Sequence, residues 1–379
     1  MLKRGIIEIN RDGIIQNIVD TRGELKETRN IEFFNGVICP GFINAHCHLE
    51  LSYLNGKIQK HLFLHGFIEK MRHLKLNDEE VQLESLNKAE EELIKNGVVG
   101  VGDISNSEIS FKVKKKSPLK YHTFIELFGP DDANAESIFN KGIYLRDKYR
   151  YEIDDSVSIT PHAPYSVSTK LFYIISEYIK ETGKTCSLHN QESMDENLYF
   201  IKQSGSFPAF FASLYKDFRS FRKTGKSSIQ SIFHHLQESN TILLVHNTFI
   251  NKDDLEFLKP YLPKIYFVLC PNSNLFIENK LPPVGLINQF SKQVAIGTDS
   301  LASNNELSVL EELKTLSAHF PQLELPELIK WGTLNGAKAL GFNNLGSIQI
   351  NSKPGINLLY DLDLHNLKLT KETKVKVII

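Results

Sequence analysis

The sequence has few cysteines, the residues whose disulfide bonds stabilise small secreted proteins. It contains only four cysteines in 379 residues, Cys39, Cys47, Cys186 and Cys270. They are widely spaced and form no Cys-x-x-Cys pair, which excludes a disulfide framework. We expect each to be a buried small hydrophobic residue in a reducing cytoplasm.

Long apolar segments are also absent. No stretch of roughly 18 apolar residues occurs, so we expect no membrane-spanning helix. The first residues, Met1 to Gly5, are not followed by the apolar core of a secretory signal. We therefore expect a cytoplasmic protein that has no membrane partner.

The chain has little excess of charge of either sign. Its 44 Lys and Arg residues against 45 Asp and Glu residues give a net charge of -1. Such a balance argues against a nucleic-acid partner, because a binding surface for nucleic acid is basic. One basic run, Lys112, Lys114, Lys115 and Lys116 with Lys120, is predicted to be a solvated loop.

Strand and helix patterns alternate through the middle of the chain. After Pro40–His48, which follows the apolar run Val37–Cys39 and is predicted to be the first strand with a turn at Gly41, apolar strand segments recur between helical segments. The seven further strands are predicted at Val98–Asp103, Tyr121–Gly129, Val157–Thr160, Thr185–His189, Thr241–His246, Ile265–Cys270 and Gln293–Asp299. The helices are predicted at Asn77–Asn96, near Ala135–Tyr149, from the cap Ser168 to Gly183, after a capping box of Ser303 and Glu306, and from Pro326 to before Gly341.

This alternation predicts an α/β fold, a (β/α)8 TIM-like barrel, with a doubly wound sheet as the alternative. Both chain ends have short β patterns instead, among them Gly346–Ile350. We expect residues 1–38 and 344–379 to form a small composite β-sandwich domain, and residues 39–343 to form the barrel. The segment 204–239, between the fifth and sixth strands, is predicted to supply extra helices or a lid.

Histidines follow several of the predicted strands. His46 and His48 are two residues apart on one strand and therefore point to the same side, where both could bind one metal ion. His189 and Asp299 end the fifth and eighth strands. In a barrel all these strand ends share one rim, so the four residues would form a three-nitrogen, one-oxygen ligand set for Zn²⁺ or Fe²⁺.

Two further residues complete a hydrolytic site. A divalent ion lowers the pKa of a bound water toward about 7, and such a water needs a proton acceptor beside it. Glu192, three residues after His189, could accept the proton and deliver it to a substrate ring nitrogen. His246 could stabilise charge in the tetrahedral intermediate, and Asp299 could pass a proton to the departing group.

Each of these residues alone would more often be a hydrogen-bonded structural residue. The prediction rests on their joint occurrence at the same end of strands one, five, six and eight. The alternatives that stay open are another hydrolytic reaction at the same site, and a metal-bearing scaffold without catalysis.

A set of motifs gives the chain a family resemblance. They are Pro-Gly-Phe-Ile-Asn-Ala-His-Cys-His (40–48), Pro-His-Ala-Pro-Tyr-Ser (161–166), His-Asn-Gln-Glu (189–192), Val-His-Asn (245–247), Cys-Pro-Asn-Ser-Asn (270–274) and Gly-Thr-Asp-Ser-Leu-Ala-Ser-Asn (297–304). With them the chain resembles the amidohydrolase superfamily over nearly its whole length, and within it the branch of S-adenosylhomocysteine and aminodeoxyfutalosine deaminases, guanine deaminase and triazine chlorohydrolases.

The resemblance implies one metal ion held by His46, His48, His189 and Asp299, with Glu192 and His246 as acid/base and water-orienting residues. Binuclear members carry a lysine at the end of the fourth strand, where this chain has Thr160-Pro161-His162. The resemblance also implies that His162 contacts the substrate.

We therefore expect a hydrolytic deaminase that removes the amino group of an adenine-type nucleoside, most similar to the aminodeoxyfutalosine type, with Glu50 and Glu126 near the substrate. The alternatives within the family are guanine or cytosine deamination, dechlorination and an imidazolonepropionase-like ring opening. The oligomeric state is left open, with a homodimer as one option.

Overall fold

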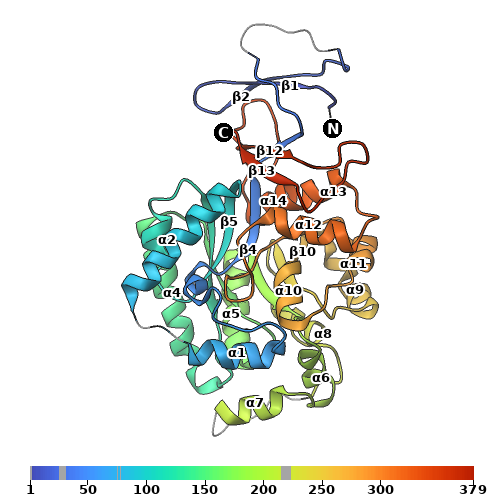
Figure 1. Ribbon diagram of the computed structural model, residues 1–379. Coiled ribbons are helices and arrows are strands. Elements are labelled where there is room, and N and C mark those ends of the chain that lie inside the picture. Colours follow the sequence, from blue (N-terminus) through green and yellow to red (C-terminus); the bar gives the residue numbers. More distant parts are fainter. Residues whose placement is uncertain (1, 25–30, 75, 77, 215–222) are drawn as a thin grey trace.

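The centre of the molecule is built from parallel strands. The computed structural model describes residues 2–24, 31–74, 76, 78–214 and 223–379. Within them, two four-stranded parallel sheets have the orders β4-β5-β6-β7 and β11-β10-β9-β8 (Figure 1). Their strands are β4 (Phe42–Cys47), β5 (Val98–Ser105), β6 (Lys120–Leu127), β7 (Val157–Pro161), β8 (Cys186–Asn190), β9 (Ile242–His246), β10 (Ile265–Leu269) and β11 (Val294–Ile296).

The two sheets are linked by backbone hydrogen bonds along both of their outer edges. Beside β7 and β8, the N–H of His189 donates to the carbonyl of His162 at 2.9 Å. Beside β4 and β11, the N–H groups of Thr298 and Asp299 both donate to the carbonyl of His46 at 3.1 Å. These links bring the carboxyl ends of the first and last strands, and of the middle strands, to the same end of the molecule.

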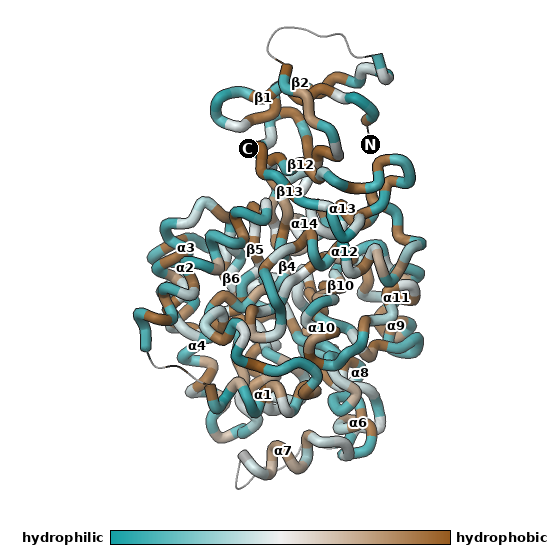
Figure 2. Tube along the Cα trace, in the orientation of Figure 1, coloured by the Kyte–Doolittle hydropathy of each residue, from teal (hydrophilic) through white to brown (hydrophobic). Residues whose placement is uncertain are grey.

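Helices surround these strands (Figure 1). Their exposed sides are hydrophilic and their inner sides hydrophobic, which gives the alternating colours along the helical segments of Figure 2. They are α1 (Phe63–His73), α2 (Glu79–Lys95), α3 (Phe111–Lys114), α4 (Ala135–Glu152), α5 (Thr169–Thr182), α6 (Met194–Lys202), α7 (Phe207–Leu214), α8 (Ser228–Ile232), α9 (Lys252–Leu258), α10 (Pro271–Glu278), α11 (Val284–Phe290), α12 (Val309–His319), α13 (Leu325–Lys330) and α14 (Gly336–Leu340). None of these described helices is both long and apolar enough to cross a membrane.

The predicted ends of α5 are confirmed. Its N-cap is Ser168, whose hydroxyl oxygen accepts the N–H of Leu171 at 3.2 Å, and Gly183 ends it in the left-handed conformation. The predicted helix 77–96 is found as α2 with Asp78 as its N-cap, while its predicted first residue, Asn77, lies outside the described residues.

The chain ends form two antiparallel sheets, which lie beyond the amino ends of the parallel strands (Figure 1). One pairs β1 (Ile6–Ile9) with β2 (Ile15–Val19), and the other has the order β13-β12-β3. This second sheet consists of β3 (Val37–Pro40), β12 (Ile356–Tyr360) and β13 (Lys374–Val377).

The predicted strand Gly346–Ile350 is wrong. The structure has turns there and no strand. Gly346 has φ +80°, and a Cβ at this position would lie 2.6 Å from the Cβ of Ala337, so the segment packs against α14 and cannot extend as a strand.

The apolar run before Gly41 and the predicted first strand after it belong to different sheets, with the predicted turn at Gly41 between them. β3 pairs with β12, and β4 pairs with β5. The break falls at Gly41, where a Cβ would lie 2.3 Å from Cγ1 of Val99. Position 41 therefore requires glycine, because the side chain of any other residue would collide with Val99.

The prediction of a solvated basic run is wrong for Lys114. Its side chain is fully buried, and its Nζ lies 2.6 Å from Oδ2 of Asp103. It also donates to the hydroxyl groups of Ser105 at 2.9 Å and Thr123 at 3.0 Å. The other oxygen of Asp103 accepts the N–H of Leu49 at 2.9 Å, so this buried pair anchors the chain directly after His48. A pattern of charges cannot reveal that one of several neighbouring lysines points inward.

The four cysteines are all free and buried, as predicted. The segment 204–239 contains α7 and α8, and residues 215–222 within it lie outside the described residues. In Figure 1, α7 lies beside α1 and α6, at the end of the molecule away from the two antiparallel sheets.

Candidate metal centre and active site

Three imidazole nitrogens meet at the carboxyl ends of β4 and β8. His46 and His48, from the end of β4, direct their Nε2 atoms to a common point, 3.1 Å apart. Nε2 of His189, from β8, lies 3.2 Å from Nε2 of His48. All three side chains are buried. The alternation of side chains along β4 thus places both histidines on the same side, with Cys47 on the other.

Asp299 completes this group from the turn after β11. Its Oδ1 lies 3.6 Å from Nε2 of His48 and 3.9 Å from Nε2 of His46. The approach depends on Gly297, where a Cβ would lie 2.7 Å from the Cβ of His46. Asp299 itself has φ +58°, a conformation that is costly for a residue other than glycine and is typical of functional sites.

The protonation of the group fits a metal ion. Nδ1 of His189 lies 3.0 Å from the carbonyl oxygen of His162, which can only accept, so Nδ1 carries the proton and Nε2 presents a lone pair. Four ligands around a tetrahedral zinc ion are roughly 3.3 Å apart, given zinc–nitrogen distances of about 2.0 Å. The observed separations of 3.1 to 3.9 Å are close to this value. His46, His48 and Asp299 therefore form one group that could hold a metal ion, and His46 and His189 form a second such group with His246.

Glu192 and His246 lie next to these four residues. Oε1 of Glu192 is 3.7 Å from Nε2 of His246, and both side chains are buried. Burial, together with the nearby charges of Asp299 and Glu278, raises the pKa of Glu192 well above its usual value. Burial lowers the pKa of His246 to about 3, which keeps its ring neutral.

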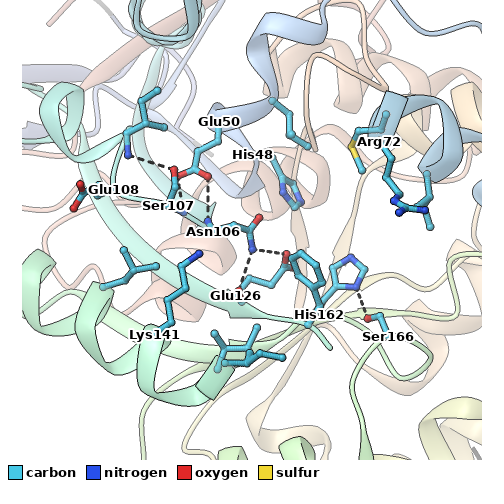
Figure 3. A pocket seen from close by; sticks show the side chains of 18 of the residues that line it. His48, Glu50, Arg72, Asn106, Ser107, Glu108, Glu126, Lys141, His162 and Ser166 are labelled. Atoms are coloured by element: carbon cyan, nitrogen blue, oxygen red, sulfur yellow. Dashed lines mark hydrogen bonds between the residues drawn. The ribbon is translucent and has the colours of Figure 1, made fainter. Parts of the chain in front are cut away.

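The site opens into two connected spaces. A small inner pocket of about 60 Å³ is lined by His48, His162, His189, Glu192, His246 and Asp299 among others. It adjoins an outer chamber of about 1520 Å³, which shares His48, His162 and Tyr165 with it. Figure 3 shows His48 and His162 among the side chains that line the outer chamber. Phe210 and Phe211 of α7 line the same chamber.

His162 has one nitrogen bound and the other available. Its Nδ1 lies 2.6 Å from the hydroxyl of Ser166, which itself donates to the carbonyl of Ala163 at 3.2 Å. The hydroxyl must therefore accept from Nδ1, so Nε2 of His162 has a lone pair.

The two predicted carboxylates, Glu50 and Glu126, line the outer chamber. Glu50 accepts the N–H groups of Asn106 at 3.1 Å and Ser107 at 3.3 Å. The side-chain amide of Asn106 in turn donates to Oε2 of Glu126 at 3.2 Å (Figure 3). Among the described residues, Oε1 of Glu126 is buried without a hydrogen bond, and it lies 3.3 Å from Nδ1 of His189. Burial raises the pKa of Glu50 to about 7 and that of Glu126 to about 8.

Several residues around the site were not predicted. Oδ2 of Asp299 accepts the hydroxyl groups of Ser273 at 2.6 Å and Ser303 at 2.8 Å. The predicted capping box of Ser303 and Glu306 is therefore wrong: α12 begins at Val309 and its N-cap is Ser308. Ser273 belongs to the motif 270–274, whose residue types gave a signal, whereas the role of Ser303 was hidden by its similarity to a helix cap.

Known proteins resemble this chain over most of its length. An adenosine deaminase from Helicobacter pylori is 30% identical over 355 residues, which cover 90% of this chain and 82% of that protein. An aminodeoxyfutalosine deaminase from Nitratiruptor is 28% identical over 363 residues, covering 90% and 86%. The crystal structure of an aminofutalosine deaminase from Helicobacter pylori, in complex with methylthio-coformycin, has a TM-score of 0.77 at 25% identity, covering 94% of this chain and 88% of that one.

A model of the amidohydrolase family matches residues 37–378. The match includes every motif that carries the predicted site, from the two histidines of β4 to Asp299. The chain belongs to the amidohydrolase family.

Proposed function

We propose that this protein is a metal-dependent hydrolytic deaminase that replaces the exocyclic amino group of an adenine-type nucleoside and releases ammonia. The observation that carries the proposal is the convergence of three imidazole nitrogens and Asp299 beside the buried pair of Glu192 and His246. Deaminases of adenosine and aminodeoxyfutalosine are the relatives named above. An aminodeoxyfutalosine-like nucleoside is the favoured substrate.

The parallel strands are proposed to close into a (β/α)8 barrel. The hydrogen bonds of His189 and Asp299 to the neighbouring strands support closure at both seams. We assign residues 39–343 to this barrel, and residues 1–38 and 344–379 to a composite β-sandwich domain. The pairing of β3 with β12 supports a unit built from both chain ends, and it extends that unit to Cys39 and Pro40.

One divalent ion, Zn²⁺ in preference to Fe²⁺, is proposed to be held by His46, His48, His189 and Asp299. A set of three nitrogens and one carboxylate oxygen suits either ion. No lysine follows β7, where Pro161 and His162 stand instead. When bound, the ion would polarise a water molecule and lower its pKa.

The protein residues would then move the protons. Glu192 accepts the proton of the attacking water and delivers it to the ring nitrogen beside the attacked carbon. The raised pKa of Glu192 makes its carboxylate a stronger base toward the water than an exposed carboxylate would be. His246 stabilises the negative charge that develops on the adding oxygen. Asp299 takes the second proton from the added hydroxyl group and passes it to the amino group, the carbon–nitrogen bond breaks as the carbonyl forms, and ammonia leaves.

The substrate would lie across both spaces of the site. The reacting edge of the ring would face the inner pocket, and the remainder of the nucleoside would lie in the outer chamber. His162, Glu50 and Glu126 are the proposed substrate-binding residues. Oε1 of Glu126 lacks a hydrogen bond and could accept one from a ribose hydroxyl.

A cytoplasmic location is also proposed, and the four free buried cysteines support it. A homodimer stays a prediction that light scattering of the purified protein would check.

The decisive experiment measures ammonia release by the metal-replete protein from a panel of substrates. The panel contains adenosine, 5′-deoxyadenosine, methylthioadenosine, S-adenosylhomocysteine, aminodeoxyfutalosine and guanine. We expect release from adenine nucleosides and the highest kcat/KM with aminodeoxyfutalosine. The Glu192→Gln variant, prepared identically, controls for contaminating deaminases. If metal-loaded protein released no ammonia from any adenine nucleoside, the proposal would be refuted.

A further inference from the structure

Glu196 is a carboxylate that the chemistry above does not use, although it lies close to Glu192. It is on the first turn of α6, and its exposed fraction is 0%. Its Oε1 accepts the N–H of Gln191 at 3.0 Å, and its Oε2 accepts the N–H of Glu192 at 3.3 Å. A single buried side chain thus binds the two consecutive backbone amides that carry the proposed acid/base residue.

This arrangement differs from an ordinary helix cap. The N-cap of α6 is Ser193, whose hydroxyl oxygen accepts the N–H of Glu196 at 3.3 Å. In a capping box the acidic residue would return this bond to the amide of the N-cap. α9 does so: Asp254 accepts the N–H of its N-cap, Asn251, at 3.2 Å. Glu196 instead reaches past its N-cap, so capping alone does not account for its contacts.

The residue before Glu192 is held from several sides. Gln191 has a left-handed backbone with φ +47°, which costs free energy in a residue other than glycine. Its side-chain amide donates to Asp254 at 2.8 Å and to Asn197 at 3.1 Å. Together with the bond to Glu196, these contacts fix a backbone conformation that would otherwise relax.

The side chain of Glu192 is free in comparison. Among the described residues, no hydrogen bond to its carboxylate group is found, and its Oε1 is 3.7 Å from His246. Its direction is consequently set by the backbone that carries it. Because a displacement of about 1 Å can reduce turnover 100-fold, holding this backbone matters for proton transfer.

We propose that Glu196 is a positioning residue for proton transfer by Glu192, acting through the backbone amides of Gln191 and Glu192. The inference rests on the proposed function, since it takes Glu192 to be the acid/base residue. It assigns to Glu196 no contact with substrate or metal.

The first test is the isosteric variant Glu196→Gln. Its amide can accept from only one of the two backbone N–H groups, and its NH₂ group faces the other. We expect kcat to fall about 10- to 100-fold, while KM stays within about threefold, because the loss affects the reacting geometry and not substrate binding. The metal content should stay at the wild-type value, while the midpoint of thermal unfolding should fall, because one buried backbone N–H loses its acceptor. An unchanged kcat, or loss of the metal, would overturn the proposal.

A double-mutant cycle separates positioning from a general structural effect. If Glu196 acts only through Glu192, the variant Glu192→Gln/Glu196→Gln should have the same residual kcat as Glu192→Gln alone. Single-turnover measurements at high enzyme concentration can resolve this residual rate. If the kcat of the double variant were instead reduced by the product of the two single-variant reductions, Glu196 would act independently of Glu192, and the proposal would be wrong.

Asp195 offers a matched control on the same turn of α6. Its Oδ2 accepts the N–H of Ser206 at 3.2 Å and has no contact with the amides of Gln191 and Glu192. Asp195→Asn should therefore keep kcat within about twofold of the wild-type value. If kcat of Asp195→Asn fell as much as that of Glu196→Gln, the effect would come from a general disturbance of α6 and not from the bonds to the two amides.

Two measurements keep the proposal testable if Glu196→Gln does not fold. Glu196→Asp, whose carboxylate is one methylene shorter, should show the same selective loss of kcat. In the wild-type protein, slow hydrogen exchange is expected for the amides of Gln191 and Glu192, and exchange at the rate of exposed amides would overturn the contact. If the wild-type protein deaminates no nucleoside, the proposed function fails instead, and the exchange result still stands by itself.

Discussion

The hydroxyl group of Ser273 donates a hydrogen bond of 2.6 Å to Oδ2 of Asp299. Ser303 donates a second bond to the same oxygen, which leaves Oδ1 directed at the histidines. The two serines thereby decide which carboxylate oxygen is available as a ligand. Such partners orient a ligand before the ion arrives.

Ser273→Ala should therefore weaken zinc binding. We expect a loss of affinity of about 10- to 100-fold, the usual effect of removing a partner of a metal ligand. Competition with a chelating dye would measure it. Ser291→Ala is a suitable control, because that hydroxyl oxygen accepts the N–H of Gln293 at the other end of β11. Equal zinc affinity in the wild type and Ser273→Ala would show that this bond does not orient Asp299.

Glu192→Gln should retain the metal and lose turnover by roughly two to four orders of magnitude, the usual contribution of an acid/base residue. The amide keeps the size of the side chain but cannot accept the proton of water. Metal analysis and ammonia release should be measured on the same sample. Near-normal activity would mean that another group carries the proton.

His162→Ala should raise KM more than it affects the metal. The ring lies at the junction of the inner pocket and the outer chamber, and its Nε2 is free to contact a bound substrate. We expect KM to rise about tenfold or more, as for the loss of one hydrogen bond to substrate. Loss of the ion in this variant would make His162 a ligand.

The free energy of unfolding should depend on pH through His122, which is not one of the proposed metal ligands. It is buried, its Nε2 lies 3.0 Å from the hydroxyl of Ser158, and burial lowers its pKa to about 4 from 6.5. Because its pKa is higher in the unfolded chain, His122 binds a proton there at a pH at which the folded protein keeps it neutral. The stabilising contribution of the neutral ring to the free energy of unfolding is therefore complete above pH 6.5 and is lost as the pH falls toward 4. Between pH 7 and 5 this loss amounts to about 2 kcal/mol.

His122→Gln should remove that part of the pH dependence. Urea unfolding of metal-free protein at pH 7 and pH 5 would give the two free energies for the wild type and for the variant. The difference between the two pH values should be smaller in the variant by about 2 kcal/mol. An identical pH dependence in both proteins would show that the pKa of His122 is not lowered by folding.

The positions of the parallel strands could be predicted because each is a short apolar run. The ends of α5 could also be predicted, since Ser168 and Gly183 are characteristic caps. The structure brings His46, His48, His189 and Asp299 together, while their roles in binding a metal stay predictions.

Other features depend on contacts between distant segments, which local patterns do not contain. The burial of Lys114 is stabilised by Asp103 on another element. Ser303 resembles a helix cap in sequence, but its partner is the carboxylate of Asp299. The turn at Gly41 is predicted from the sequence, but the closeness of Val99, which requires a glycine there, is not contained in any periodicity.

The break at Gly41 also ties the far end of the chain to the candidate metal centre. β13 pairs with β12, β12 pairs with β3, and only Gly41 separates β3 from β4, the strand that carries His46. Shortening the chain or attaching a purification tag at Ile379 would thus act on the scaffold of the first two histidines. Recombinant versions are better extended at the amino terminus, where β1 and β2 form a sheet of their own.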